Sequence, residues 1–296
     1  MEKNELTQAD LVNKEKRDPK TIRKYTKHSA QNPDGVKPYV TPRETPISRK
    51  QKRKRVDYAT ENEDTDFYKE NWSFVDTTPV EEDGVPNRKT KPQWVRPRNK
   101  NKKVKKAPKH KHCSKFQTSL ALNRRGCSKP HIHAKRRKLK SGPNKGKFAF
   151  THLGVGAKEM ARAAKKVVVP FMKETNSKIV VMDCTRNNHN DTVRKVFEDA
   201  GIYVYPSAGY TDGVKNGYPP NSHDCMPNET FHSVFKNQIY SEFRSLPRER
   251  QNMNNLYNLI LKVQKQMTPK LVAPHIKKLP AVMKLIIQKK GGPTGK

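Results

Sequence analysis

The sequence predicts an α/β fold in which a sheet is flanked by helices. Short apolar, β-branched runs typical of buried strands alternate, along the second half of the chain, with segments whose apolar residues recur at helical spacing. Hydrophobic residues make up only 32% of the 296 residues, so a large part of the chain cannot lie in a packed core. We therefore expect one compact α/β domain with basic extensions.

Each element of this domain follows from a local pattern. Apolar runs predict strands at residues 73–75, 116–123, 178–182 and 202–205. Helices are predicted at residues 156–175, at residues 191–200 and from Glu229 onward. In the second helix Val193, Val196 and Phe197 share one face, and Gly201 is suited to end it.

The remaining segments are predicted as appendages of this domain. Asp18 is a good N-cap and Pro19 a good first helical residue, so residues 1–30 are predicted to hold a partial DNA-binding helix-turn-helix that carries Lys20 and Arg23. A basic helix with no role in DNA binding is the alternative. We further predict a basic linker at 31–60, the α/β domain at 61–250 with a basic insertion at 86–147, and C-terminal helices at 251–296.

The charge of the chain points to a polyanionic partner. Its 63 Lys and Arg outnumber 28 Asp and Glu, which gives a formal charge of +35. No apolar run is long enough for a membrane span, and the first residues lack the apolar stretch of a signal peptide. The four cysteines lie far apart, without the spacing of a disulfide framework. We expect a soluble, intracellular protein.

Much of the positive charge lies in one block. Residues 86–147 contain 23 Lys and Arg and no Asp or Glu. Because the stretch 116–123 alternates like a strand and a turn follows it, we interpret the block as basic loops on a sheet that contact nucleic acid. Mere solubility is the alternative. A second run, at 49–55, could be a nuclear localisation signal, a phosphate-binding helix or a solvated face. The predicted contacts in the two segments are Lys52, Arg53, Lys54, Arg55, Arg124, Arg125, Arg136 and Arg137.

Three acids stand where a metal site could form. Asp76 and Asp183 each follow an apolar strand, and ligand sites of open α/β sheets collect at the carboxyl ends of strands. Glu229 lies in the first turn of its helix. If the three converge, they could hold two Mg²⁺ ions about 4 Å apart, an arrangement that serves phosphodiester displacement. Taken singly, the acids could equally be a strand-end cap, a turn residue and a helix cap.

The sequence segments around these acids resemble those of the mariner-type DDE transposases. Residues 55–59 (RVDYA) and 72–76 (WSFVD) look like that family's approach to its first catalytic aspartate, and residues 178–189 (KIVVMDCTRNNH) are similar to its second strand. Residues 206–236, which end in SHDCMPNETFHSVFK, look like its SPDLNPIE-type box, with Glu229 on the catalytic acid. The tail at 290–294 (KGGPT) is similar to the family's GG-x-T ending.

This resemblance covers the chain from about residue 7 to its end and carries specific implications. It implies an RNase H-like mixed sheet flanked by helices and a short N-terminal helix-turn-helix remnant. It also implies catalysis by Asp76, Asp183 and Glu229, with two Mg²⁺ or Mn²⁺ ions as cofactors. The expected partner is double-stranded DNA, both transposon ends and target, bound by a homodimer in the nucleus, or in the nucleoid of a prokaryote.

The sequence also departs from the family pattern. Only about one helix-turn-helix unit fits where the family has two. Asp76 is followed by Thr77 and Thr78 in place of the usual acidic residue and serine. Between Asp183 and Glu229 lie 45 residues, more than is usual, with the surplus at 207–221.

Other readings of the sequence stay open. An inactive or domesticated transposase-derived DNA-binding protein, or a basic RNA-binding protein of ribosomal type, would also carry this charge. Zinc binding is conceivable, although the spacing lacks a C-x₂-C pair. Its candidate ligands are His110, His112, Cys113, Cys127, His131 and His133.

Overall fold

A computed structural model describes residues 37–39, 47–82, 93–95, 114–138, 140–141, 145–146, 148–208 and 216–294. The chain divides into two units, one of residues 1–45 and 87–111 and one of residues 46–86 and 112–296. In the first unit, the described part is a two-stranded antiparallel sheet of β1 (Lys37–Tyr39) and β3 (Gln93–Val95). The predicted helix-turn-helix, with Lys20 and Arg23, lies outside the described residues.

The second unit is built on a mixed sheet. Its strands run in the order β10–β9–β2–β4–β5, and β6 also pairs with β4. The three strands β10 (Tyr203–Val204), β9 (Ile179–Met182) and β2 (Ser73–Glu81) are parallel, whereas β4 (Lys115–Asn123) is antiparallel to β2. The short strands β5 (Gly126–Cys127) and β6 (His131–Ile132) are antiparallel to β4. The predicted strands are therefore present, and they form the mixed sheet that the resemblance implied.

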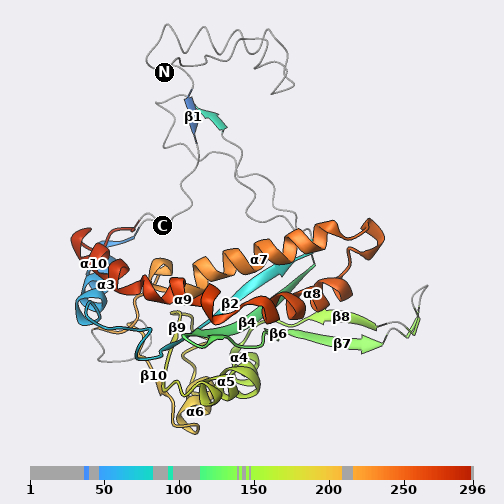
Figure 1. Ribbon diagram of the computed structural model, residues 1–296, viewed down its shortest axis with the longest axis horizontal. Coiled ribbons are helices and arrows are strands. Elements are labelled where there is room, and N and C mark those ends of the chain that lie inside the picture. Colours follow the sequence, from blue (N-terminus) through green and yellow to red (C-terminus); the bar gives the residue numbers. More distant parts are fainter. Residues whose placement is uncertain are drawn as a thin grey trace, which may run out of the picture. The chain divides into compact units, whose positions relative to one another are not determined.

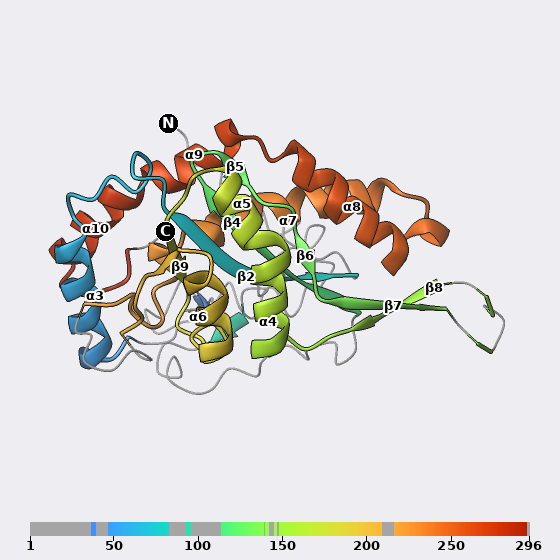
Figure 2. The ribbon, with the colours of Figure 1, turned by 90° about the horizontal axis from the view of Figure 1, so that it is seen from below.

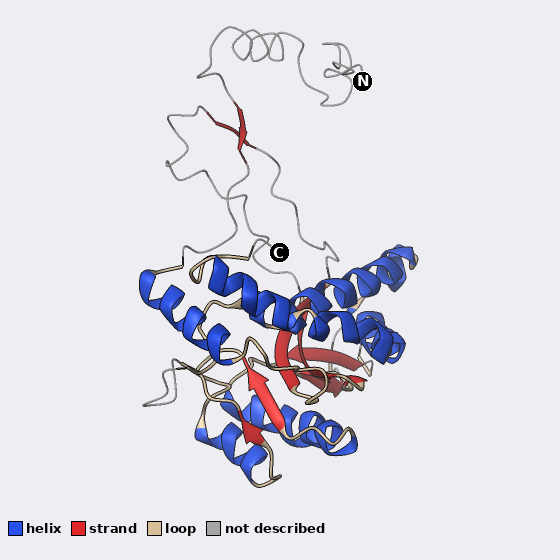
Figure 3. Cartoon of the chain, turned by 60° about the vertical axis from the view of Figure 1, so that its left-hand side comes forward, coloured by secondary structure: helices blue, strands red, loops and turns tan. Residues whose placement is uncertain are grey.

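Helices cover both faces of this sheet (Figures 1 and 3). One face carries α7 (Pro227–Ser245), α8 (Met253–Gln266), α9 (Pro269–Lys277), α10 (Leu279–Gln288) and α3 (Arg49–Glu61). The opposite face carries α6 (Asp191–Glu198) and one long helix, which comprises α4 (Ala157–Ala163), a π-helical turn (Ala164–Val168) and α5 (Val169–Glu174). The predicted α/β class is confirmed.

Alternation along the strands separates two apolar cores. Phe74 and Val80 of β2 belong to the core under α7, and Val75 belongs to the core under α4. On β9, Val181 belongs to the first core and Met182 to the second. Successive strand residues point to opposite faces of the sheet, and both faces are covered by helices. Both sets of side chains are therefore apolar, and the sequence of such a strand is a continuous apolar run.

Two sequence expectations need correction. Asp76 is the fourth of nine residues of β2, not the residue after a short strand. The expected linker at 31–60 contains α3, whose Tyr58 and Ala59 are fully buried. Within the expected insertion at 86–147, the predicted strand at 116–123 is present as the nearly fully buried β4. The sequence left a helix at 49–55 as one alternative among three, because the apolar residues of α3 are few and pack against distant segments.

A basic hairpin leaves the sheet after β6. It consists of β7 (Ala134–Lys138) and β8 (Phe148–His152), which pair antiparallel (Figure 1). The side chains of Lys135 to Lys138 are exposed.

Within the described residues, no helix is both apolar and long enough to cross a bilayer.

Replacing Gly291 by Ala is expected to cost more than about 2 kcal/mol of unfolding free energy. Gly291 follows α10 with φ +77°, a conformation that penalises any side chain, and a Cβ there would overlap the backbone of Lys52 in α3. Chemical denaturation measures the loss. Gly292→Ala is the matched control, since its Cβ would lie 3.0 Å from the carbonyl oxygen of Lys289. Equal losses in the two variants would contradict close packing of α3 on Gly291.

Candidate functional site

The strand register brings Asp76 and Asp183 together. Val75 pairs with Met182 at the end of the parallel ladder between β2 and β9, and each aspartate is the next residue of its chain segment. Val75 and Met182 both point into the core under α4. Because side chains alternate along a strand, the two aspartates point to the opposite face, which α7 covers.

The start of α7 carries the third acid to the same face. The buried Asn228 donates from Nδ2 to the carbonyl oxygen of Phe74 at 3.2 Å, which docks the first turn of α7 on β2. Glu229 is the next residue, and its Oε1 lies 2.9 Å from Nδ1 of His223. His223 belongs to a 3₁₀ turn, His223–Cys225, just before α7. One packing contact thus sets where Glu229 stands relative to β2.

The acids lie close enough for their charges to shift one another's pKa values. Burial, followed by repulsion from Asp183 and Glu229, raises the pKa of Asp76 to about 8. Burial is also the main cause that raises the pKa of Asp183, with Glu229 adding to it, although Thr185 and Asn188 donate hydrogen bonds to its carboxylate. The hydrogen bond from His223 lowers the pKa of Glu229. Repulsion among buried carboxylates is characteristic of sites that bind cations.

The acids are neighbours without forming one tight cluster. In the described part of the chain, one set of three potential ligand residues has its ligand atoms all within 4.8 Å of one another, and that set is His131, His133 and Glu159. Asp76, Asp183 and Glu229 are spaced more widely. Two cations about 4 Å apart need such a spread, because acids at the two ends of the pair bind different ions.

A buried histidine lies beside Asp76. His232, one turn further along α7, places Nδ1 3.5 Å from Oδ2 of Asp76, and both side chains are largely enclosed. Burial lowers the pKa of His232 to about 3, so the imidazole is neutral at pH 7. It therefore contributes no positive charge beside Asp76. Carboxylate oxygens are hard ligands of the kind that Mg²⁺ and Mn²⁺ prefer.

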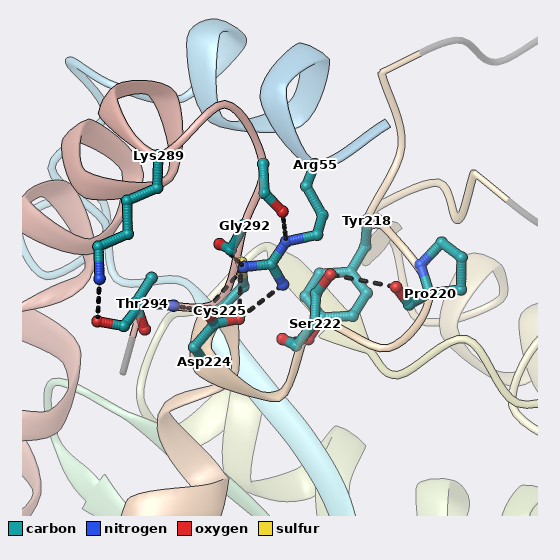
Figure 4. A network of polar contacts seen from close by, with 10 residues as sticks. Arg55, Tyr218, Pro220, Ser222, Asp224, Cys225, Lys289, Gly292 and Thr294 are labelled. Atoms are coloured by element: carbon teal, nitrogen blue, oxygen red, sulfur yellow. Dashed lines mark hydrogen bonds and ion pairs between the residues drawn. The ribbon is translucent and has the colours of Figure 1, made fainter. Parts of the chain in front are cut away.

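A buried ion pair holds the loop that carries His223 (Figure 4). Arg55 of α3 donates from Nη1 and Nη2 to the two carboxylate oxygens of Asp224, both at 2.7 Å. Its Nε donates to the carbonyl oxygen of Gly291 at 3.0 Å, and the backbone N–H of Thr294 donates to Asp224 at 3.3 Å. We call Arg55, Asp224, Gly291, Gly292 and Thr294 the clasp. It joins α3, the 3₁₀ turn and the segment after α10.

The chain is similar to known proteins in structure. No family model and no curated protein matches the sequence. Among solved structures, the Mos1 transposase paired-end complex with left transposon end superposes at TM-score 0.53 and 12% identity, covering 97% of this chain and 75% of that chain. The Mos1 transposase catalytic domain with Raltegravir and Mn superposes at TM-score 0.50 and 14% identity, covering 85% of this chain and 99% of that chain.

The chain has the fold of the Mos1 transposase catalytic domain. The RNase H-like mixed sheet implied by the sequence motifs is thereby confirmed. In this Mos1-like fold the three predicted acids meet on the α7 face of the sheet, at the end of the parallel ladder between β2 and β9.

The predicted nucleic-acid contacts lie in different environments of the Mos1-like fold. Lys52, Arg53, Arg125, Arg136 and Arg137 are exposed. Lys54 and Arg124 are partly buried: Lys54 donates to the carbonyl oxygen of Ala208, and Arg124 to that of Lys69 at 3.0 Å. The prediction that Arg55 contacts nucleic acid is wrong, because its side chain is 1% exposed and is held in the clasp. Its role is to hold the fold together.

Replacing Asp76 by Asn is expected to raise the Tm of the metal-free protein at pH 8 by a few degrees. The folded-state pKa of Asp76 is about 8 against an ordinary 3.8, so the folded protein keeps a proton that the unfolded chain releases. Stability is therefore full at low pH and falls as the pH rises through 8. About 1 kcal/mol shifts Tm by about 2–4 °C for a domain of this size.

Thermal melts in EDTA at pH 5 and pH 8 check this expectation. The advantage of Asp76→Asn over wild type should be larger at pH 8, and Mg²⁺ should remove it by stabilising wild type. Asp191→Asn, an exposed acid in the first turn of α6, is the matched control and should show no such pH dependence. A variant that loses stability at both pH values would show that repulsion among the acids is not what limits the site.

Proposed function

We propose that this protein is a DNA transposase that cleaves transposon ends and transfers the strands into target DNA, using Asp76, Asp183 and Glu229 to bind two Mg²⁺ or Mn²⁺ ions. The observation that carries the proposal is the register of β2 and β9, which sets Asp76 and Asp183 side by side under the helix that bears Glu229. Related solved structures support it, because they include the mariner Mos1 paired end complex with Mg and the Mos1 strand transfer complex.

Three groups of side chains would serve cleavage and strand transfer. The acids would hold the cations, which supply charge stabilisation for the attacking and leaving oxygens of a phosphodiester. Asn188 and Thr185 hold the Asp183 carboxylate in one orientation. Neutral His232 lies beside Asp76 and adds no positive charge that would compete with a cation. Water or a DNA 3′-hydroxyl can be the nucleophile in the same geometry.

The partner in this proposal is double-stranded DNA, bound by two protomers on two ends. The hairpin of β7 and β8 supports DNA binding, because Arg136 and Arg137 are exposed next to further lysines on a strand without acidic residues. Phosphate contacts by such side chains fix the position of a protein on DNA without reading its sequence.

Nicking of supercoiled plasmid tests the function without knowledge of the transposon ends. We expect the purified protein to convert supercoiled DNA to nicked circles in Mn²⁺ or Mg²⁺ and to stop when EDTA is added. Ca²⁺ is the control cation, because it binds carboxylates but has looser coordination than Mg²⁺. DNA binding without nicking in any divalent cation would contradict the proposal and leave a transposase-derived DNA-binding protein.

Replacing Arg136 and Arg137 together by Ala is expected to weaken binding to all DNA sequences alike. Each phosphate contact contributes about 0.9 to the slope of log affinity against log salt, so the slope should fall by about 2. Fluorescence anisotropy over a salt series measures it. The charge-matched control is Arg248→Ala with Arg250→Ala, two exposed residues of the 3₁₀ turn Arg248–Arg250. An equal change of slope in both double variants would remove the hairpin from the DNA surface.

A further inference from the structure

Three potential metal ligands meet on the face of the sheet opposite the acids. They are His131 of β6, His133 just after it, and Glu159 of α4, and their ligand atoms all lie within 4.8 Å of one another. Figure 2 shows α4 on this face, with β6 and the β7–β8 hairpin beside it. None of the three belongs to the acid site, and the sequence motifs did not join Glu159 to the histidines.

The backbone explains why these side chains converge. His131 pairs with Ser119 of β4, and the N–H of His133 donates to the carbonyl oxygen of Gln117 at 2.8 Å, so both histidines lie on extended chain beside β4. Residues two apart on extended chain point to the same face. That face is covered by α4, because Met160 contacts Ser119 there, and Glu159 is the neighbour of Met160.

One of the histidines is oriented by its surroundings. His133 is fully buried, and its Nε2 lies 2.7 Å from the hydroxyl of Ser119, which in turn lies 2.5 Å from the hydroxyl of Thr77. A hydrogen bond to one ring nitrogen orients the imidazole and favours metal binding through the other nitrogen. Metal-binding histidines are commonly held in this way by a second residue.

We propose that His131, His133 and Glu159 bind a zinc-class transition-metal ion that ties the base of the β7–β8 hairpin to α4. Two imidazoles and one carboxylate suit Zn²⁺ and leave a fourth position for water, whereas Mg²⁺ prefers oxygen ligands alone. The N–H of Leu153, just after β8, donates to the carbonyl oxygen of His133 at 3.1 Å, so the site stands where both hairpin strands leave the sheet. Cys127, a zinc candidate in the sequence, is not in this cluster, and His110, His112 and Cys113 lie outside the described residues.

A neighbouring arginine competes for the carboxylate. Arg162 donates from Nη1 to Oε1 of Glu159 at 2.6 Å, and its side chain is 52% exposed, so it can move into solvent when a cation binds. Positive charge on Arg162 and Lys166 also lowers the pKa of His131, which burial lowers first. Removal of Arg162 should therefore tighten metal binding, an effect that a purely structural role for the cluster would not produce.

Titration of the chelator-treated full-length protein with Co²⁺, followed by visible absorption, tests the site directly. Measurements are made in an Asp76→Asn, Asp183→Asn background, so that failure here is distinct from failure of the transposase proposal, on which this inference does not rest. We expect a d–d absorption band typical of nitrogen ligation, which Zn²⁺ abolishes and Mg²⁺ leaves unchanged. No band, or one that Mg²⁺ removes, would overturn the proposal.

Single substitutions assign the ligands. His131→Phe and Glu159→Gln should each weaken Co²⁺ binding by about tenfold or more, and Arg162→Gln should strengthen it by about two- to fivefold. The matched control is Glu174→Gln, an exposed acid of α5, which should bind Co²⁺ as the background does. Zn²⁺ should also raise the Tm of the background protein but not that of Glu159→Gln. Affinities that are equal in all variants would place the metal elsewhere and overturn the proposal.

Discussion

Asp183→Asn is expected to lower metal-dependent DNA cleavage by about a thousandfold or more while changing DNA affinity by less than about twofold. Asp183 is the acid directly after β9, and Asn188 and Thr185 hold its carboxylate in place. Asn keeps the shape of the side chain but removes the negative charge that would hold a cation. Binding to DNA relies on basic residues elsewhere, so it should persist.

The nicking assay and fluorescence anisotropy measure the two quantities on the same preparation. Glu229→Gln should have a similar effect on cleavage, and Asp191→Asn, which removes an exposed acid outside the site, should have none. Cleavage by Asp183→Asn at the wild-type rate would mean that another group supplies the activity. Loss of DNA binding together with cleavage would point to a folding defect instead.

Arg55→Ala is expected to cost about 3–5 kcal/mol of unfolding free energy, the largest loss of stability among the substitutions considered. The substitution leaves Asp224 without its ion-pair partner and removes the donor to the carbonyl oxygens of Gly291 and Gly292. Arg55→Lys should recover little, because an ammonium group cannot bind the carboxylate with two parallel hydrogen bonds. Chemical denaturation at pH 7 measures both losses.

The pH dependence gives the clasp a second signature. Hydrogen bonds from Arg55 and Thr294 outweigh burial and lower the pKa of Asp224 below its ordinary 3.8. The stability from the clasp is therefore present above the unfolded-state pKa and is lost as the pH falls through the folded-state pKa. Wild type and Arg55→Ala should converge in stability at acid pH. Lys52→Ala, on an exposed position of α3, is the control and should match wild type throughout.

The elements with strong local signals were predictable. The β-branched run of β9 and the amphipathic helix α6, which Asn190 caps and Gly201 follows at φ +69°, form where we expected them. By contrast, α3 is a run of basic residues with few apolar ones. Its start carries a local signal, the capping box of Ser48 and Gln51. Its place in the fold depends on Tyr58 and Ala59, which pack into a core built mostly by later segments.

The candidate site divides in the same way. The acids could be predicted because each lies in a strand, directly after a strand or at a helix start, and because the sequence around each resembles that of the family. The burial of Arg55 could not, because its partners lie 169 and 236 residues further along the chain. His131 and His133 of the histidine cluster were among the candidate zinc ligands in the sequence, but Glu159 comes from a helix that only the fold brings over β6.

The clasp also sets a time order for synthesis. Arg55 leaves the ribosome long before Gly291, 236 residues later, has been added. At about 5–20 residues per second, α3 waits on the order of tens of seconds for its partner segment. During that interval Arg55 lacks Gly291 as a partner, and translation stopped before residue 291 would release a polypeptide that cannot form the complete clasp.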